Sequence, residues 1–82
     1  SYREAIQNAA IAAAMQRPDS GLVAALERVA GEQELPAAAL AVLARRGDPH
    51  ARAALARLME DARGWVRTWA RDAAARTGAG GR

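Results

Sequence analysis

The sequence predicts an all-α fold in which antiparallel helix pairs stack one after another, as a fragment of an α-solenoid. Strong helix formers, above all Ala, Leu, Arg and Glu, dominate the 82 residues, and β-branched residues are few. Short breaks divide the chain into five segments, and breaks this short make neighbouring helices antiparallel. The pattern also recurs about every 30 residues, which is typical of stacked helical repeats.

The first helix is expected from about Tyr2 to Gln16, where the break at residues 17–19 ends it. Helical spacing assigns its inward face to Ile6, Ala9, Ala10, Ala13 and Ala14. The second helix is expected from about Ser20 to Ala30, with Asp19 or Ser20 as N-cap and Gly31 as its end. Its inward face is predicted to hold Leu22, Ala25, Leu26 and Val29.

The third helix is expected from about Leu35 to Arg46, with Gly47 in the left-handed C′ conformation. Asp48 as N-cap then starts a fourth helix, which begins at Pro49 and ends near Glu60. A fifth follows residues 61–64 and ends at about Thr77, before Gly78. The predicted inward faces are Leu35, Ala38, Ala39, Val42 and Leu43 in the third helix, Ala51, Ala54, Leu55 and Leu58 in the fourth, and Val66, Trp69, Ala70, Ala73 and Ala74 in the fifth.

The repeat relates the second helix to the fourth, because Asp19 and Asp48 open corresponding helices 29 residues apart. The same offset relates the first helix to the third, and an offset of 31 carries Gly47 onto Gly78 and relates the third helix to the fifth. The predicted order of helix types is therefore B, A-B, A-B, in one domain over residues 1–78. Residues 79–82 are expected to be a flexible Gly-rich tail.

The stretch from Leu43 to Gly78 resembles the HEAT-like repeats of the phycocyanobilin (PBS) lyase type. The positions that carry the resemblance are Asp61, Val66, Arg67, Ala70, Ala73 and Gly78. The resemblance covers about half the chain and implies that Asp61 and Arg67 form a structural polar pair between adjacent repeats. The preceding unit departs from the pattern, since Glu32 and Ala38 stand where the family has Asp and Arg.

Composition sets wider limits on the protein's class. The chain has no Cys and no Lys, a composition that fits a GC-rich bacterial genome and a cytoplasmic location. No apolar run reaches the roughly 20 residues that span a bilayer, so we expect no membrane partner. Because the chain begins at Ser1, we expect a processed product or a piece of a longer protein. The net charge of +3 is uneven: residues 1–44 hold three Arg against five acids, and residues 45–82 hold nine against four.

The sequence predicts no catalytic, cofactor-binding or metal-binding residues, and therefore not an enzyme. His50, the sole His, falls in the first turn of a helix, which favours a surface or capping role over that of a base or ligand. Glu60 and Asp61 are adjacent, and neighbours on a helix point about 100° apart, so they do not make a catalytic pair. No glycine-rich phosphate loop precedes a helix.

The leading functional hypothesis is a protein-protein interaction or scaffold module. Trp69 is predicted to cover the core, whereas Trp65 is the better candidate for contact with another protein chain or with further repeats. Arg63 and Arg71 flank these residues and complete the candidate partner-binding set. A thin, Ala-rich core favours an end that is covered by such a partner.

Two alternatives stay open. The stripe of Arg63, Arg67 and Arg71, together with Arg45, Arg46 and Arg52, predicts a nucleic-acid-binding repeat if these side chains share a surface. The resemblance alone implies an accessory domain of a lyase-type enzyme.

Overall fold

The computed structural model describes residues 5, 8–9, 11–13 and 15–78, which form helices joined by turns and include no strand. The helices are α2 (Ser20–Val29), α3 (Leu35–Arg45), α4 (Pro49–Leu58) and α5 (Gly64–Thr77), and parts of the first segment are also helical. The all-α prediction is confirmed, with the ends of these four helices within two residues of expectation. None of the described helices is long and apolar enough to cross a membrane.

Short-range chemistry sets the helix ends. Asp19 Oδ1 accepts the Leu22 N–H at 2.8 Å, and Asp48 Oδ1 accepts the N–H groups of His50 and Ala51 at 2.9 and 3.0 Å. These bonds satisfy donors that have no partner within the helix. Gly47 and Gly78 take the predicted left-handed conformation, with φ of 99° and 78°. The predictions of Asp48 as N-cap and of Gly47 and Gly78 as helix ends are therefore confirmed, and of the two candidates at the start of α2 the N-cap is Asp19.

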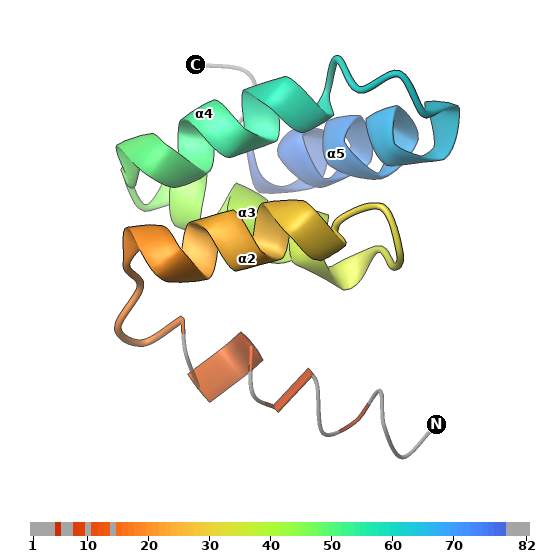
Figure 1. The fold of residues 1–82 in the computed structure, drawn as a ribbon. Coiled ribbons are helices and arrows are strands. Elements are labelled where there is room, and N and C mark those ends of the chain that lie inside the picture. The colour runs from red at the N-terminus through yellow and green to blue at the C-terminus, as the bar shows by residue number, and fades with distance from the viewer. Residues whose placement is uncertain (1–4, 6–7, 10, 14, 79–82) are drawn as a thin grey trace.

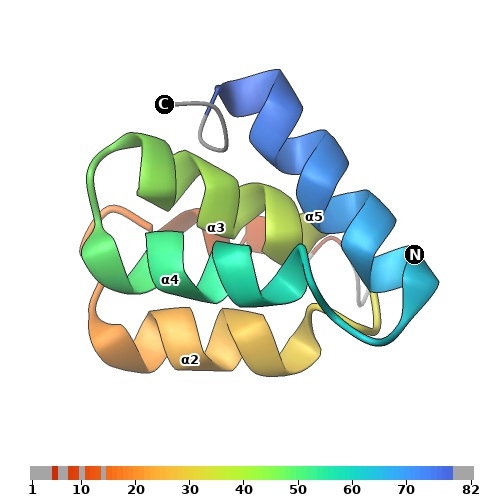
Figure 2. The ribbon, with the colours of Figure 1, turned by 90° about the horizontal axis from the view of Figure 1, so that it is seen from above.

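The helices lie in two layers (Figure 1). The first layer holds α2 and α4, which contact each other, and the second holds α3 and α5. Helix α3 contacts all three of the others and is the centre of the described fold. Seen from above, the axes of α2, α3 and α4 are nearly parallel lines, whereas the axis of α5 is inclined to them (Figure 2).

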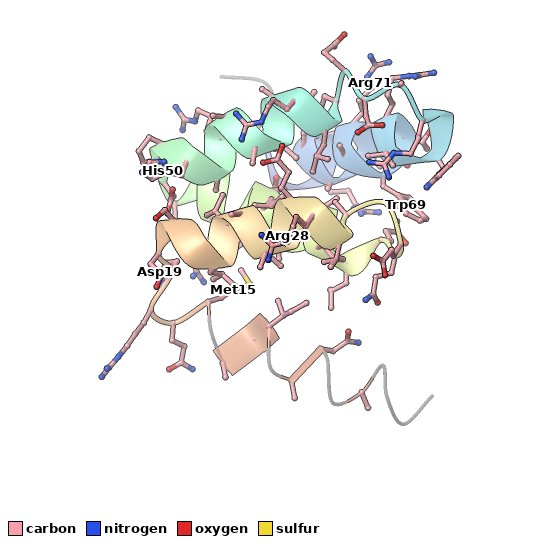
Figure 3. All side chains as sticks on the ribbon, viewed as in Figure 1. Met15, Asp19, Arg28, His50, Trp69 and Arg71 are labelled. Atoms are coloured by element: carbon pink, nitrogen blue, oxygen red, sulfur yellow. The ribbon has the colours of Figure 1, made fainter. Side chains whose placement is uncertain are left out.

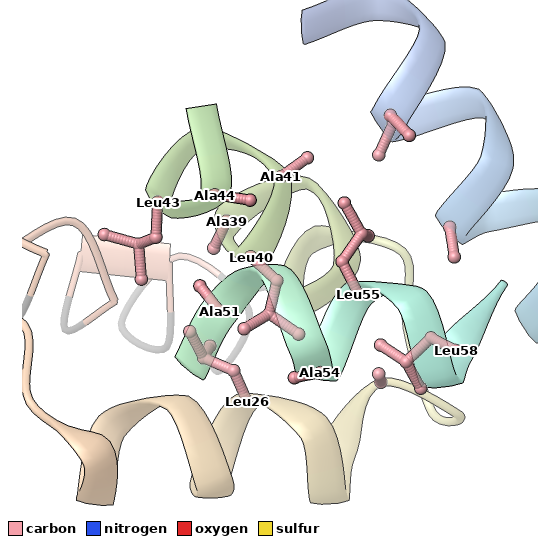
Figure 4. Packing of buried hydrophobic residues seen from close by; sticks show 14 of the residues in the cluster. Leu26, Ala39, Leu40, Ala41, Leu43, Ala44, Ala51, Ala54, Leu55 and Leu58 are labelled. Atoms are coloured by element: carbon pink, nitrogen blue, oxygen red, sulfur yellow. The ribbon is translucent and has the colours of Figure 1, made fainter. Parts of the chain in front are cut away.

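The core between the layers is built mainly from small side chains. Among the described residues, Ala supplies 10 of the 17 buried hydrophobic ones, and the largest side chains buried completely include Leu40 and Leu43 of α3. In Figure 4, Leu40 points from α3 toward α4, next to Ala54 and opposite Leu26 of α2. Small side chains let the helix backbones approach closely, but each buried methyl adds only about 0.8 kcal/mol.

The predicted inward face of α4 is confirmed, since Ala51, Ala54, Leu55 and Leu58 are all buried. For α3 the predicted face was wrong in part: Leu35, Ala38 and Val42 are only half-buried. The more deeply buried positions of α3 are Pro36, Ala37, Ala39, Leu40, Ala41, Leu43 and Ala44. Because α3 packs against three helices, most of its circumference is covered, and a single apolar stripe does not describe it.

The first segment also packs by a different face from the one predicted. Ala9 and Ala13 are exposed, while Ile11 and Met15 pack against the core. These two larger side chains remove more apolar surface from water than alanine does, so they decide which face turns inward. Ile6, Ala10 and Ala14 lie outside the described residues, as does the predicted tail. In α2, Leu26 is buried as predicted, and it is joined by Val23, whereas Leu22, Ala25 and Val29 are half-buried.

Candidate functional site

Trp65 is the one large hydrophobic side chain that stands exposed among the described residues, with 53% of its surface open to solvent. It lies in the first turn of α5, and its indole N–H donates to the Gly31 carbonyl at 2.9 Å. Gly31 belongs to the turn between α2 and α3, so this bond joins that turn to the start of α5. The hydrogen bond fixes the position of the indole and leaves half of the residue available for contact.

Arg63 lies over the same glycine. A Cβ atom built on Gly31 would collide with the Arg63 guanidinium, so a larger residue at position 31 would displace this side chain. Asp61 holds the arginine in place: its Oδ1 and Oδ2 accept from Arg63 Nε and Nη2 at 2.9 and 3.0 Å, and its Oδ1 also accepts the Arg63 backbone N–H at 2.8 Å. The turn before α5 is thus built around one carboxylate.

These bonds lower the pKa of the Asp61 carboxyl from 3.8 to about 2, first through the Arg63 side chain and then through the Arg63 backbone N–H. A lowered pKa in the folded state means that Asp61 stabilises the fold above its unfolded pKa, near 4, and that this contribution is lost as the pH falls toward 2. We expect a carbon-detected NMR titration to give a midpoint near 2 for Asp61. In Arg63→Gln the midpoint should rise toward 3.8, and an unchanged midpoint would contradict this assignment.

The Arg67 side chain contacts the main chain of the same turn. Its Nη1 donates to the Asp61 carbonyl at 2.7 Å and to the Ala62 carbonyl at 3.1 Å. Arg67 therefore contacts the backbone oxygen of Asp61, whose carboxylate is engaged by Arg63. The contact joins the first turn of α5 to the connection before it, whereas the resemblance implied a pair between adjacent repeats.

Arg71 closes the end of α4. Its Nε donates to the Met59 carbonyl at 2.9 Å, and its Nη2 lies 3.4 Å from Glu60 Oε2. Trp69, predicted to cover the core, is half-buried, and Figure 3 shows it beside the turn between α2 and α3. The structure thus brings the four partner-binding candidates to the end of the fold where the α2–α3 turn lies beside the α4–α5 connection. These candidates are Arg63, Trp65, Trp69 and Arg71.

The predicted basic surface is divided. Arg63 and Arg71 form ion pairs with Asp61 and Glu60 of the connection between α4 and α5, which reduces the charge of the stripe. Arg45, Arg46 and Arg52 flank the turn between α3 and α4, at the other end of α4. The six arginines therefore do not form one continuous surface. His50 is exposed at that second end, and the described residues hold no group of three or more metal-ligating side chains.

Two further features were not predicted from the sequence. Arg57 of α4 makes a two-pronged ion pair with Glu27 of α2, at 2.8 Å for both bonds, and this pair lowers the pKa of Glu27. A hollow of about 350 Å³ lies between the first segment, α3 and α5. Its lining residues are Asn8, Gln33, Glu34, Leu35, Ala38 and Arg76. The separation of 30 residues between Glu27 and Arg57, equal to the repeat length, was the available signal for the ion pair.

Comparison with known proteins adds no relative: no family model matches the chain, and no curated protein or solved structure shows significant similarity. The resemblance to HEAT-like repeats accordingly rests on the residues of this sequence.

Proposed function

We propose that the protein is a non-catalytic protein-interaction module, built as a short HEAT-like helical stack in which α2–α3 and α4–α5 are successive repeats. Equivalent helices contact each other in each layer, α2 with α4 and α3 with α5. Polar contacts also join residues about one repeat apart: Glu27 with Arg57, and the Met15 carbonyl with Arg46 at 3.4 Å. The second pair differs from the first in its geometry, because α4 lies nearly parallel to α2 whereas α5 is inclined to α3 (Figure 2).

Trp65 is the residue that supports a role in protein binding. Trp is enriched among the residues that dominate binding energy, because its large ring buries much apolar area at a small cost in side-chain entropy. Here the bond to Gly31 already restricts the ring, so a partner that covers it loses less conformational freedom. Arg63 beside it is restrained by Asp61 in the same way. A rigid aromatic side chain next to a positioned guanidinium suits contact with a protein surface.

Photo-cross-linking tests this proposal. Benzoylphenylalanine placed at Thr68, which is exposed one turn after Trp65, should form an adduct with one particular protein in the source cells. The same group at Ala53, which is exposed on α4, is the matched control and should give none. Trp65→Ala should remove the adduct and weaken the purified complex by about 30-fold or more, the loss expected for an interface hot spot of at least 2 kcal/mol.

Circular dichroism melting establishes that Trp65→Ala remains folded. Adducts of equal yield from positions 53 and 68, or a complex whose affinity does not depend on Trp65, would contradict the proposal.

A further inference from the structure

The arginines of the described chain divide into two groups by their partners. Four pair with acids: Arg57 of α4, Arg63 in the connection between α4 and α5, and Arg71 and Arg76 of α5. Six arginines form no ion pair with any described residue: Arg28 in the last turn of α2, the half-buried Arg67 of α5, and the exposed Arg17, Arg45, Arg46 and Arg52. We call the surface of Arg17, Arg45, Arg46, Arg52 and His50 the arginine end.

The arginine end is a single region of the fold. Arg17 lies in the turn before α2, and the other residues flank the turn between α3 and α4. Figure 1 shows these two turns on the same side of the molecule, and Arg46 Nη1 joins them by its bond of 3.4 Å to the Met15 carbonyl. Figure 3 places Asp19 and His50 on that side as well, away from Arg71 and Trp69.

Two of the four guanidinium groups are held by neutral acceptors. Arg46 donates to the Met15 carbonyl, and Arg52 Nη2 donates to the Ala44 carbonyl at 3.2 Å. A carbonyl oxygen restrains a guanidinium without cancelling its charge, because the carbonyl itself carries no net charge. Ordering before binding reduces the entropy that a ligand must otherwise overcome.

The acidic residues of this region cap helices and form no ion pair with the four arginines. Asp19 and Asp48 are the N-caps of α2 and α4, where each accepts backbone N–H groups of the first turn. The N-terminal ends of α2 and α4, which carry the positive ends of their helix dipoles, also lie in this region. They partly neutralise the negative charge of the Asp19 and Asp48 carboxylates. Four arginines against two capping acids leave the region with an excess of positive charge.

We propose that the arginine end binds the phosphate backbone of nucleic acid. Planar guanidinium groups match phosphate oxygens in a two-pronged geometry, and duplex DNA presents one negative charge about every 1.7 Å along its axis. An anionic membrane is a less suitable partner. Segments that bind a membrane surface combine basic residues with exposed large apolar side chains. Among the described residues the exposed large apolar side chain is Trp65, which lies at the other end of α4. This inference goes beyond the proposed protein-binding role, and the two sites leave room for both partners at once.

The test is fluorescence anisotropy with a 20-base-pair DNA duplex at 50 and 200 mM salt. Four phosphate contacts predict that the affinity of the wild-type chain falls roughly 150-fold over this range. The double variant Arg17→Gln/Arg45→Gln removes two charges that make no hydrogen bond within the described structure. It should bind more weakly at 50 mM salt and lose only roughly 12-fold between the two salt concentrations.

The matched control is Arg57→Gln/Arg71→Gln, which removes the same charge from paired arginines at the far end of α4. Its affinity and salt dependence should stay nearer to those of the wild-type chain than those of the first double variant, because charges beyond a Debye length, about 10 Å at 0.1 M salt, are largely screened. Absence of binding at 50 mM salt overturns the proposal. Equal losses in the two double variants, or tighter binding to phosphatidylserine vesicles or to polyglutamate than to the duplex, overturn it too.

Discussion

Leu40→Ala should lower the free energy of unfolding by about 3 kcal/mol, within the 2–5 kcal/mol typical of buried leucines. Leu40 is fully buried in α3, the helix that contacts α2, α4 and α5, so its removal leaves a cavity where the layers meet. A domain of this size is stable by roughly 4–12 kcal/mol. The single change therefore removes a large share of the total. Urea unfolding followed by circular dichroism measures it.

Leu35→Ala is the control for Leu40→Ala, because it makes the same chemical change on the same helix at a half-buried position. The surrounding solvent fills part of the space left there, so the expected loss is about 1 kcal/mol, taken as a fraction of the full transfer value. Equal losses for the two variants would show that Leu40 does not lie at the centre of the core.

Ala54→Leu should destabilise the fold by about 1–3 kcal/mol, although leucine is more hydrophobic than alanine. Ala54 is fully buried on the face of α4 near Leu26 of α2, and a larger side chain there forces the two helices apart (Figure 4). The ion pair between Glu27 and Arg57 joins the same two helices and should weaken with the separation. Thermal and urea unfolding report the change.

Ala53→Leu is the matched control for this substitution. Ala53 is the neighbouring residue in α4 and is exposed, so the same change should alter the free energy of unfolding by no more than about 0.5 kcal/mol. A stabilising effect of Ala54→Leu would mean that α2 and α4 are not closely packed.

Local signals in the sequence predicted the helix ends because each depends on a few neighbouring atoms. Asp48 caps α4 through two N–H groups within three residues of it, and Gly78 ends α5 because its φ of 78° suits a residue without a side chain. The inward face of α4 was also predictable, since its alanines and leucines alternate with arginines at helical spacing.

The face of α3 was not predictable in the same way. Its sequence is apolar on most sides, so periodicity cannot choose among positions that three different helices cover. The first segment shows a related limit, because alanines at good spacing competed with Ile11 and Met15, and only packing against the core decides between them.

For the candidate site, the residue types were visible in the sequence but their partners were not. Trp65 and Arg63 stood out, whereas their common contact, Gly31, lies about half the chain away and carries no side chain. The ion pairs of Arg57 with Glu27 and of Arg76 with Glu34 likewise depend on which helices the fold brings together. Charge counting along the sequence could not identify these partners.

Methyl NOEs of Leu26 give the most direct test of the two-layer arrangement. The account predicts cross-peaks between the Leu26 methyl groups and the Ala54 methyl group, because α2 and α4 are neighbours in one layer. In a closed up-and-down bundle of the same four helices, α2 would lie beside α5 and diagonally opposite α4. Cross-peaks from Leu26 to Ala70 or Ala73, in place of those to Ala54, would therefore contradict the stacked layers.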